Sequence, residues 1–301
     1  MKNGIARSPL FYVGDKYKLI RDIKAHFPHN INRFIEPFVG GGSVMMNVDA
    51  NSFILNDINS YVIAIHRMLC SYINNKNDFY DRFFNLAKGY GLSLSFCGHT
   101  VPDELKKTFP KTYYAKYNKS SYNLLKEKFN KEGKKDIVKL YMLLIYGFNR
   151  MLRFNKKGDF NLPVGDVDFN KNTYDALEDY FTILQHKQIE WHNEDFRVFL
   201  RNIQFQENDF VYLDPPYLIT FSEYNKLWNE QDEMELLQLL DCLNEQNIRF
   251  AISNVTHYKD RQNNIFIDWA RKYQTHTIKS NYISYHDNSI KQFNEVIIKN
   301  Y

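Results

Sequence analysis

Residues 214–217 combine an acid, two rigid residues and an aromatic ring in one short segment, Asp214-Pro215-Pro216-Tyr217. They follow the apolar run 211–213, which is typical of a buried strand. Proline has no backbone N–H, so the strand must end here, with the carboxylate of Asp214 beside the ring of Tyr217. A carboxylate at a strand end can accept a hydrogen from a bound substrate. The alternative is an ordinary proline turn capped by the acid.

A second acid follows a glycine-rich loop nearer the N-terminus. The loop VGGG (39–42) stands between an apolar run and a helical pattern, where a backbone must approach a neighbour or ligand closely. The dinucleotide pattern G-x-G-x-x-G fails because its third position is Met45, which disfavours a nicotinamide cofactor. Asp57 ends the next strand, where its carboxylate could accept the hydroxyl hydrogens of a ribose. An unrelated glycine turn is the alternative.

The elements that must hold these acids alternate between strands and helices. We expect strands at 33–38, 52–57, 211–214, 249–254 and 294–301. We expect helices at 43–48 (with Ser43 as its N-cap), 61–90, 137–148, 233–246 and 265–273. This pattern predicts an α/β fold with a mostly parallel sheet and helices on both faces. Both acids would then lie at carboxyl ends of parallel strands, where such sheets bind ligands.

Composition is that of a globular protein, with an uneven charge distribution. The net charge is +4, yet residues 101–160 contain 15 Lys and Arg against 6 Asp and Glu, which is +9 and leaves −5 elsewhere. A basic segment of this kind either meets a polyanion or is a solvated helical surface. The three cysteines are scattered, which fits a reducing cytoplasm and argues against a disulfide framework or a zinc site. We expect no membrane span and no signal peptide.

The motifs, taken in order, resemble the Dam family of DNA adenine-N6 methyltransferases, particularly its phage-type members with the Asp-Pro-Pro-Tyr tetrapeptide (group α). The matching segments are FYVGDKYKLI (11–20), EPFVGGGSV (36–44), NDIN (56–59), GFNRMLRFNKKGDFNLPVG (147–165) and LDPPY (213–217). The first segment departs from the family, because relatives often have Lys-Trp where this chain has Phe11-Tyr12 and a glycine where it has Asp15. This departure puts a base contact from Phe11 in doubt.

The resemblance implies a Rossmann-like S-adenosylmethionine-dependent methyltransferase sheet with an inserted, mostly helical DNA-recognition domain. The implied division is a catalytic domain of residues 1–64 and 167–301, with the target-recognition insert at 65–166. The implied catalytic residues are Asp214, Pro215, Pro216 and Tyr217. The implied cofactor-binding residues are Tyr12, Lys16, Glu36, Pro37, Phe38, Gly40, Gly42, Asp57 and Asp214. No metal is expected.

In the implied chemistry, Asp214 and the Pro215 carbonyl accept the two hydrogens of the adenine amine, and Tyr217 stacks on a base flipped out of the duplex. The implied DNA-binding residues are Phe148, Asn149, Arg150, Met151, Arg153, Asn155, Lys156, Lys157 and Pro163. Among them Arg153 would read a guanine edge, and Arg150, Lys156 and Lys157 would meet phosphates. Phe148 and Met151 could fill the gap left by the flipped base.

The resemblance also implies double-stranded DNA as the partner, GATC as the target sequence and a bacterial cytoplasm or nucleoid as the location. We expect a monomer, with a dimer on DNA as the alternative. Other readings are a methyltransferase acting on RNA, a protein amide or cytosine N4, a catalytically silent DNA-binding protein on the same scaffold, and a nucleotide-dependent oxidoreductase. Asp214 favours adenine, because relatives acting on glutamine or cytosine carry Asn or Ser at that position.

Overall fold

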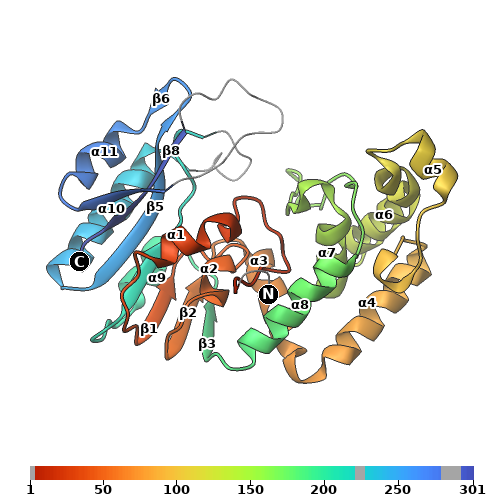
Figure 1. Cartoon of the computed structure of the whole chain (residues 1–301), viewed down its shortest axis with the longest axis horizontal. Coiled ribbons are helices and arrows are strands. Elements are labelled where there is room, and N and C mark those ends of the chain that lie inside the picture. The colour runs from red at the N-terminus through yellow and green to blue at the C-terminus, as the bar shows by residue number, and fades with distance from the viewer. Residues whose placement is uncertain (1–3, 221–227, 279–292) are drawn as a thin grey trace. The chain divides into compact units, whose positions relative to one another are not determined.

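The computed structural model describes residues 4–220, 228–278 and 293–301. The chain divides into two compact units (Figure 1). The helical unit contains Met1–Tyr17, Gly40–Met46 and Asn59–His186, and the sheet unit contains Lys18–Val39, Asn47–Ile58 and Lys187–Tyr301. These two units differ from the expected catalytic and recognition domains. The N-terminal segment and the glycine loop belong to the helical unit, whereas they were expected in the catalytic domain. The functional division stays a prediction.

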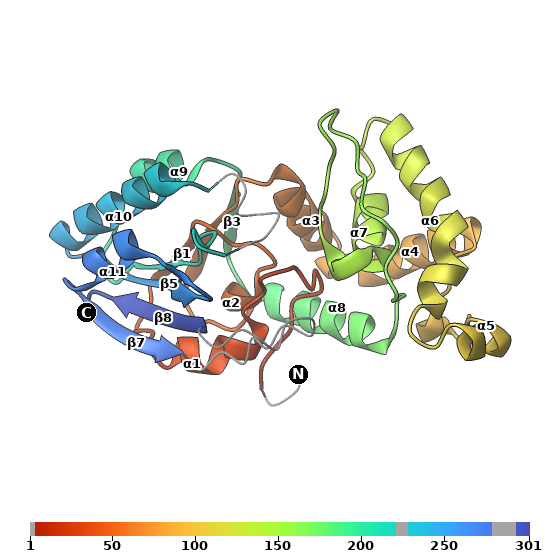
Figure 2. The same ribbon diagram turned by 90° about the horizontal axis from the view of Figure 1, so that it is seen from above.

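The sheet unit is built on one mixed sheet. Its strands are β1 (Arg33–Glu36), β2 (Ser52–Asn56), β3 (Ile189–His192), β4 (Phe210–Leu213), β5 (Arg249–Tyr258), β6 (Arg261–Gln262), β7 (Gln274–Ile278) and β8 (Phe293–Lys299). The order is β3-β2-β1-β4-β5-β8-β7, with β6 paired to β5. Strands β3 to β5 along this order are parallel, whereas β8 is antiparallel to both of its neighbours. Figure 2 shows β5, β8 and β7 side by side. The expected α/β fold with a mostly parallel sheet is confirmed.

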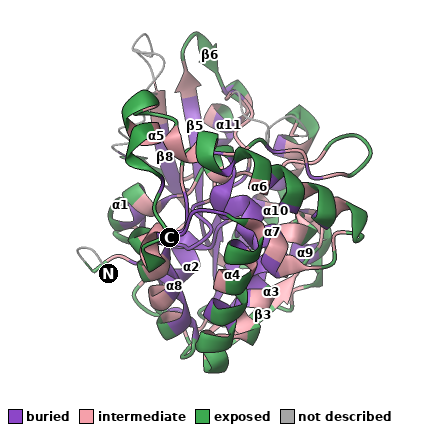
Figure 3. Cartoon of the chain, turned by 90° about the vertical axis from the view of Figure 1, so that its right-hand side faces the viewer, coloured by how far each residue is buried: buried purple, intermediate pink, exposed green. Residues whose placement is uncertain are grey.

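Helices of the same unit cover the sheet. They are α1 (Ile20–Lys24), α9 (Phe196–Asn202), α10 (Glu230–Glu245) and α11 (Asn264–Ala270). The apolar faces of α9, α10 and α11 form one buried cluster with the side chains of β1, β2, β4, β5 and β8. The strands β5 and β8 appear largely as buried chain in Figure 3. Phe27, which follows α1, packs against Phe34, Phe210 and Tyr212, so aromatic rings fill the space behind β1 and β4.

The helical unit packs around a buried central helix. It contains α2 (Ser43–Met46), α3 (Ser60–Ser71), α4 (Lys76–Tyr90), α5 (Asp103–Thr108), α6 (Tyr113–Lys131), α7 (Ile137–Tyr146) and α8 (Lys171–Leu184), with short 3-10 turns at η2 (Ile73–Asn75), η3 (Ser95–Cys97) and η4 (Phe148–Arg150). A further 3-10 turn, η1 (Tyr17–Leu19), lies at the junction of the units. Helices α3, α4 and α6 all contact α7, and Asp136 caps it by accepting from the backbone of Val138 and Lys139. None of the helices within the described ranges could span a bilayer.

The structure corrects several expected elements. Ser43 is the first residue of α2 rather than its cap, and the helical pattern 61–90 is divided into α3 and α4 by η2. Three strands end earlier than expected: β1 ends at Glu36 instead of Phe38, β2 at Asn56 instead of Asp57, and β4 at Leu213 instead of Asp214. The sequence analysis also missed three strands and five helices, namely β3, β6, β7, α1, α5, α6, α8 and α9. Strand β3 is an edge strand with one exposed and three half-buried residues, so its sequence IEWH carries little hydrophobic alternation.

Candidate active site

The carboxyl ends of β1 and β4 form the reversal point of the sheet. The two strands are adjacent and parallel, with Ile35 paired to Val211. From β1 the chain runs outward through β2 to β3 on one side, and it returns later to form β4 on the other side. Arg33 secures this pair at its opposite end, because its guanidinium bonds both carboxylate oxygens of Asp209 at 2.9 and 2.5 Å. Open α/β sheets bind ligands beyond the carboxyl ends of strands at such a point. Glu36 ends β1 here, and Asp214 directly follows β4.

Asp214 and Tyr217 are hydrogen-bonded to each other. The hydroxyl of Tyr217 donates to Asp214 Oδ1 at 2.9 Å and also lies 3.1 Å from Oε1 of Glu295, a fully buried residue of β8. Burial, and then the charges of Asp214 and Glu295, raise the pKa of the Tyr217 hydroxyl well above its usual value, so the hydroxyl keeps its proton. The prolines and this bond together fix the carboxylate and the ring as one rigid group.

The segment after β1 is held by β2. The Asn56 side-chain amide donates to the Pro37 carbonyl at 3.0 Å, and the Val39 N–H donates to the Asn56 carbonyl at 2.8 Å. Phe38 packs against Phe196 at 5.5 Å between ring centroids. Glu36 is almost fully buried. The backbone that leads from the sheet toward the glycine loop is therefore rigidly placed.

The turn after β2 is fixed through its main chain. The Asn193 amide donates to the carbonyls of Asp57 and Ile58 at 2.8 and 3.1 Å. These bonds hold the turn by its backbone, and the Asp57 side chain stays at the end of the strand, half-buried. The neighbouring Ile58 side chain is 67% exposed. The turn thus presents a carboxylate and an apolar surface next to each other.

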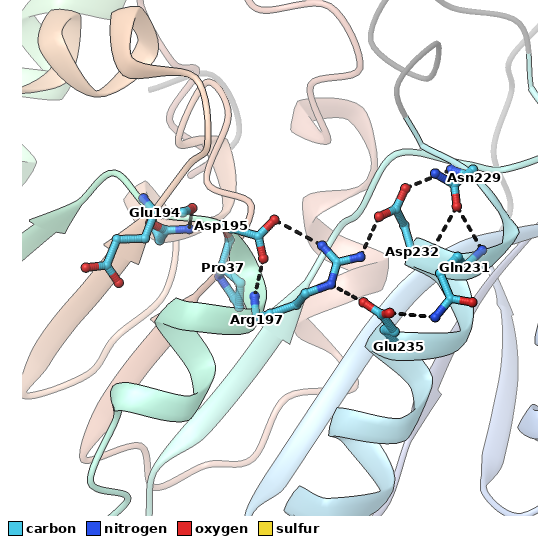
Figure 4. Close-up of polar contacts among 9 residues, drawn as sticks. Pro37, Glu194, Asp195, Arg197, Asn229, Gln231, Asp232 and Glu235 are labelled. Carbon is cyan, nitrogen blue, oxygen red and sulfur yellow. Dashed lines mark hydrogen bonds and ion pairs between the residues drawn. The ribbon is translucent and has the colours of Figure 1, made fainter.

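A third strand end, after β3, carries an acid that sequence reasoning missed. Asp195 caps α9 by accepting from the Arg197 N–H, and it also binds the Arg197 guanidinium at 3.0 Å. Figure 4 shows that guanidinium among three carboxylates, because Asp232 and Glu235 of α10 bind it as well. This network ties α9 to α10 and fixes the position of Asp195. Asp195 could not be recognised from the sequence because β3 itself was not.

In the helical unit, Tyr12 lies against the glycine loop. A Cβ added to Gly41 would come within 2.9 Å of the Tyr12 Cβ, and one added to Gly40 within 3.6 Å of its ring. Gly40 and Gly42 both have positive φ. Backbone conformation therefore requires glycine at positions 40 and 42, and the close packing of Tyr12 requires it at position 41.

Asp15 and Lys16 lie in the same N-terminal segment. Lys16 is buried, with its ammonium 3.4 Å from the Gly14 carbonyl. Asp15 Oδ1 accepts from the Tyr17 N–H at 2.6 Å. Burial raises the pKa of the Asp15 carboxyl, and a hydrogen bond from the Ser43 side chain opposes part of this rise. A cationic group of a ligand beside this buried carboxyl would favour its charged form.

The segment 147–165 forms a hairpin in which several expected DNA-binding residues have structural partners. Phe154 and Phe160 are bridged, and Asn155 closes the turn between them by accepting from the N–H groups of Lys157 and Asp159. Arg153 donates from Nε and Nη2 to the side chain and carbonyl of Asn161 at 3.0 and 2.8 Å. Two of the five guanidinium donors of Arg153 thus hold the hairpin together.

The start of the hairpin is strained and partly exposed. Asn149 and Arg150 both have φ near +50°, an uncommon backbone conformation for residues with side chains. Phe148 is 52% exposed and Asn149 is also exposed, whereas the Arg150 guanidinium stacks on the Phe11 ring at 3.9 Å. Burial lowers the pKa of Arg150 to about 10, so it stays charged at neutral pH. The loop therefore presents Phe148 and Asn149 outward and uses Arg150 for packing.

The remaining expected contacts divide by exposure. Lys156 and Lys157 at the hairpin turn are exposed, and so is Pro163, whose carbonyl accepts from the Phe148 N–H at 2.9 Å. Met151 is half-buried. Side chains at the turn are thus accessible to a large partner, whereas Arg153 already bonds Asn161 and Arg150 stacks on Phe11.

Sequence reasoning assigned no role to three further residues that contact candidate residues of their own unit. Glu295 lies in a segment expected as a strand, but only its contact with Tyr217 shows its importance. His66 and Ser8 both bond carbonyls of the glycine loop. A lone histidine in a helical pattern and a serine near the N-terminus carry no signal by themselves. The acid inside the apolar run of β8 was the one available clue.

The chain matches a family model described as D12 class N6 adenine-specific DNA methyltransferase over residues 12–284. It is 32% identical over 308 residues to the Type II methyltransferase M.FokI of Planomicrobium okeanokoites and 33% identical over 307 residues to the modification methylase StsI of Streptococcus sanguinis. These alignments cover 99% and 98% of the chain but 43% of each relative. The chain thus spans less than half the length of these two relatives.

A shorter relative is matched over most of its length. The DNA adenine methylase of Escherichia coli strain K12 is 27% identical over 282 residues, which cover 91% of the chain and 87% of that protein. The similarity to these three methyltransferases extends over at least 91% of the chain.

Proposed function

Because the chain belongs to the D12 class of N6 adenine-specific DNA methyltransferases, we propose that it transfers a methyl group from S-adenosylmethionine to the N6 amine of an adenine in double-stranded DNA. The observation that carries this proposal is the rigid Asp214-to-Tyr217 group at the reversal point of the sheet. A carboxylate, a proline carbonyl and an aromatic face are the groups that an exocyclic amine on a flipped base requires.

The chemistry depends on where the amine hydrogens go. The lone pair of the adenine amine is delocalised into the ring, so the amine is a poor nucleophile. Asp214 accepts one N–H and the Pro215 carbonyl accepts the other, which localises the lone pair on nitrogen and aims it at the methyl donor. Tyr217 donates to Asp214 Oδ1 and so holds the carboxylate in a fixed orientation. S-adenosylmethionine, when bound, would supply the electrophilic methyl group and leave as S-adenosylhomocysteine, and Asp214 would take the proton that the methylated nitrogen must lose.

The residues present fit that cofactor in two respects. The buried carboxyl of Asp15, whose charged form burial disfavours, would be stabilised by the cationic amino group of the methionine part. The carboxylate of Asp57 is the type of acceptor that binds a ribose diol, and Ile58 beside it offers apolar surface. We assign cofactor binding to Tyr12, Lys16, Glu36, Pro37, Phe38, Gly40, Gly42, Asp57 and Asp214.

DNA binding is assigned to the hairpin and the basic segment. Lys156 and Lys157 are exposed and would meet phosphates, while Phe148 and Asn149 project from a strained loop, which is frequent at functional sites. Arg153 would read a guanine with the donors that Asn161 leaves available. We retain Arg150, Met151, Asn155 and Pro163 as supports of this surface. We expect a monomer in the bacterial cytoplasm, with a dimer on DNA as the alternative.

The target we propose is GATC, on the resemblance of segment 147–165 to the Dam family. The higher identities belong to the two modification methylases, so the target needs a test that presumes no sequence. The protein is expressed in a host without adenine methylation, and its DNA is read by single-molecule sequencing. N6-methyladenine confined to GATC supports the full proposal. Methylation at another short sequence would support the activity and show that GATC is not the target. Unmodified DNA would contradict the activity.

The same experiment distinguishes a silent DNA-binding protein from an enzyme. Such a protein would bind duplex DNA and leave it unmodified. Expression of Asp214→Ala in the same host is the matched control, because it removes the proposed acceptor and leaves the hairpin unchanged. Methylation by the wild type and none by this variant assigns the modification to the chain itself.

A further inference from the structure

A buried histidine bonds the glycine loop from within the helical unit. His66 of α3 is fully buried, with Nε2 2.9 Å from the Gly40 carbonyl and Nδ1 2.9 Å from the Tyr180 hydroxyl. A carbonyl can only accept, so Nε2 must carry the hydrogen, and Nδ1 then accepts from Tyr180. Both ring nitrogens are satisfied by the neutral imidazole. Cys70 lies 3.8 Å from the same Tyr180 hydroxyl.

A buried serine bonds the next carbonyl of the loop. The Ser8 hydroxyl donates to the Gly41 carbonyl and accepts from the Leu10 N–H at 3.2 Å. Ser8 is as fully buried as His66. Two side chains, from positions 8 and 66, therefore hold two successive carbonyls of one loop.

Holding a carbonyl also sets the direction of the N–H that follows it. In a trans peptide the C=O of one residue and the N–H of the next point in opposite directions across one plane. The bond from His66 to Gly40 thus turns the Gly41 N–H away from His66, and the bond from Ser8 turns the Gly42 N–H away from Ser8. Successive N–H groups of a glycine loop are donors for a carboxylate.

We propose that His66 and Ser8 are positioning residues that orient the Gly41 and Gly42 N–H groups for the carboxylate of S-adenosylmethionine. This proposal rests on the proposed function. The imidazole lies close to Gly42, because a Cβ added there would lie 3.0 Å from His66 Cε1 and 2.9 Å from Met45 Cε. The loop and the imidazole are therefore packed as one unit.

The neutral state of His66 suits this role. Burial lowers the pKa of His66 to about 4, so the imidazole is uncharged at neutral pH. His66 therefore adds no charge beside the backbone donors at neutral pH. The bond to Gly40 opposes the shift but does not outweigh burial.

The test compares cofactor binding with turnover in four variants. His66→Leu and Ser8→Ala remove the donors, whereas His66→Gln and Ser8→Thr keep a donor of similar reach. Calorimetry with S-adenosylmethionine should show a dissociation constant about tenfold higher for the first two, equivalent to about 1.4 kcal/mol. The second pair should recover most of the affinity. Turnover at saturating cofactor should change much less than affinity in all four.

Asn118→Ala is the matched control for lost stability. Asn118 is fully buried in the same unit and makes two hydrogen bonds with Ser93, at 2.8 and 2.9 Å, away from the glycine loop. This variant should lower the unfolding temperature as His66→Leu does while keeping the wild-type dissociation constant. If His66→Leu also keeps that constant, His66 only supports the fold and the proposal is wrong.

A separate readout distinguishes this proposal from the proposed function. Wild-type protein that binds no S-adenosylmethionine would contradict the function itself. In cofactor-free protein, the amide NMR signals of Gly41 and Gly42 should shift in His66→Leu and Ser8→Ala and stay unchanged in Asn118→Ala. Unchanged signals in the first two variants would show that these side chains do not set the loop, whatever the cofactor.

Discussion

At the scale of single residues, the proposed transfer depends most directly on the carboxylate of Asp214. One of its oxygens is already held by Tyr217 at 2.9 Å, so the orientation of the group is set before any substrate arrives. A preorganised acceptor of this kind stabilises the transition state because it need not reorganise as charge develops. The surrounding residues serve largely to hold this acceptor still.

We expect Asp214→Ala to reduce methyl transfer by at least about a hundredfold, or about 2.7 kcal/mol of transition-state stabilisation, because the amine loses its charged acceptor. Transfer of radiolabelled methyl groups to duplex oligonucleotides measures the effect. Asp175→Asn, an exposed acid paired with Lys171 in the helical unit, is the control. A loss of less than tenfold in Asp214→Ala would remove Asp214 from the catalytic role.

Asp57→Ala should weaken S-adenosylmethionine binding by about 1.5–3 kcal/mol, because two ribose hydroxyls lose a charged acceptor. DNA affinity should stay unchanged. Titration calorimetry measures the first quantity, and fluorescence anisotropy with labelled duplex measures the second. An unaltered cofactor affinity would move the ribose contact to another strand end, with Asp195 as the next candidate.

His66 should make the protein less stable in acid. Its pKa is about 4 in the folded chain and 6.5 in an unfolded one, so the unfolded state binds more protons between these values. Stability should therefore be complete above pH 6.5 and fall as the pH approaches 4. At 1.36 kcal/mol per pH unit the loss is about 3 kcal/mol. Urea unfolding between pH 7 and pH 4 measures it, and a His66→Gln variant with the same pH dependence would contradict the assignment.

A functional residue could be identified from the sequence when the residues that mark it are its neighbours in the chain, and not when its role depends on a distant contact. Asp214 was recognisable because the apolar run before it and the two prolines after it are adjacent in sequence. His66 was not, because its role arises from a contact with Gly40, 26 residues away. Arg153 was recognised as basic, but its bond to Asn161 depends on a hairpin that composition does not reveal.

At the scale of elements, the hairpin within 147–165 can present its exposed turn to DNA only if its own internal contacts hold it in shape. Its strands are joined by the Phe154–Phe160 bridge and by the pair of Arg153 and Asn161. Its aromatic side is packed, since Phe154 stacks on Tyr61 of α3 at 4.3 Å between ring centroids. These contacts hold the two sides of the hairpin next to the exposed turn at Lys156 and Lys157.

Arg153→Ala and Asn161→Ala should both slow methylation on every DNA sequence, because each removes the pair that supports the hairpin. If Arg153 also reads a guanine, Arg153→Ala should lose a further 1–3 kcal/mol or so on the cognate site alone. Methylation rates on single-substitution oligonucleotides separate the two contributions. Equal losses in both variants on all sites would leave Arg153 with a supporting role only.

Elements were predictable to the degree that their own residues are buried in a regular pattern. Strand β4 and helix α7 are buried throughout or nearly so, and both were expected within two residues of their bounds. Strands β3 and β7 lie at the two edges of the sheet and have mostly exposed or half-buried residues. Their assignment depends on pairing with a neighbour, which a local pattern does not contain.

At the scale of the whole molecule, charge is concentrated in one part of the sequence. Residues 101–160 carry +9 in a chain of net charge +4. Such a concentration favours association with a polyanion at low salt, and each neutralised phosphate releases counterions. The salt dependence of binding therefore reports how many of these lysines contact DNA.

Lys156→Ala and Lys157→Ala should each lower the slope of log affinity against log salt by about one, on cognate and altered sites alike. The physical reason is that phosphates are the same in every sequence. Lys171→Ala is the control, because Lys171 is exposed and already paired with Asp175. A slope that changes on the cognate site alone would make these lysines base readers instead.

The pairing of β1 with β4 has a consequence for how the chain is made. Phe34 pairs with Phe210, and the Arg33–Asp209 ion pair spans the same 176 residues. A ribosome adding about 5–20 residues per second needs roughly 10–35 seconds to cover that distance. Throughout this time β1 and β2 lack the neighbours that complete the sheet, whereas the long run of the helical unit from Asn59 to His186 emerges in between. The nascent chain therefore carries unfinished apolar strands while much of its helical part is already available to fold, so these strands are exposed to non-native contacts until β4 has been made.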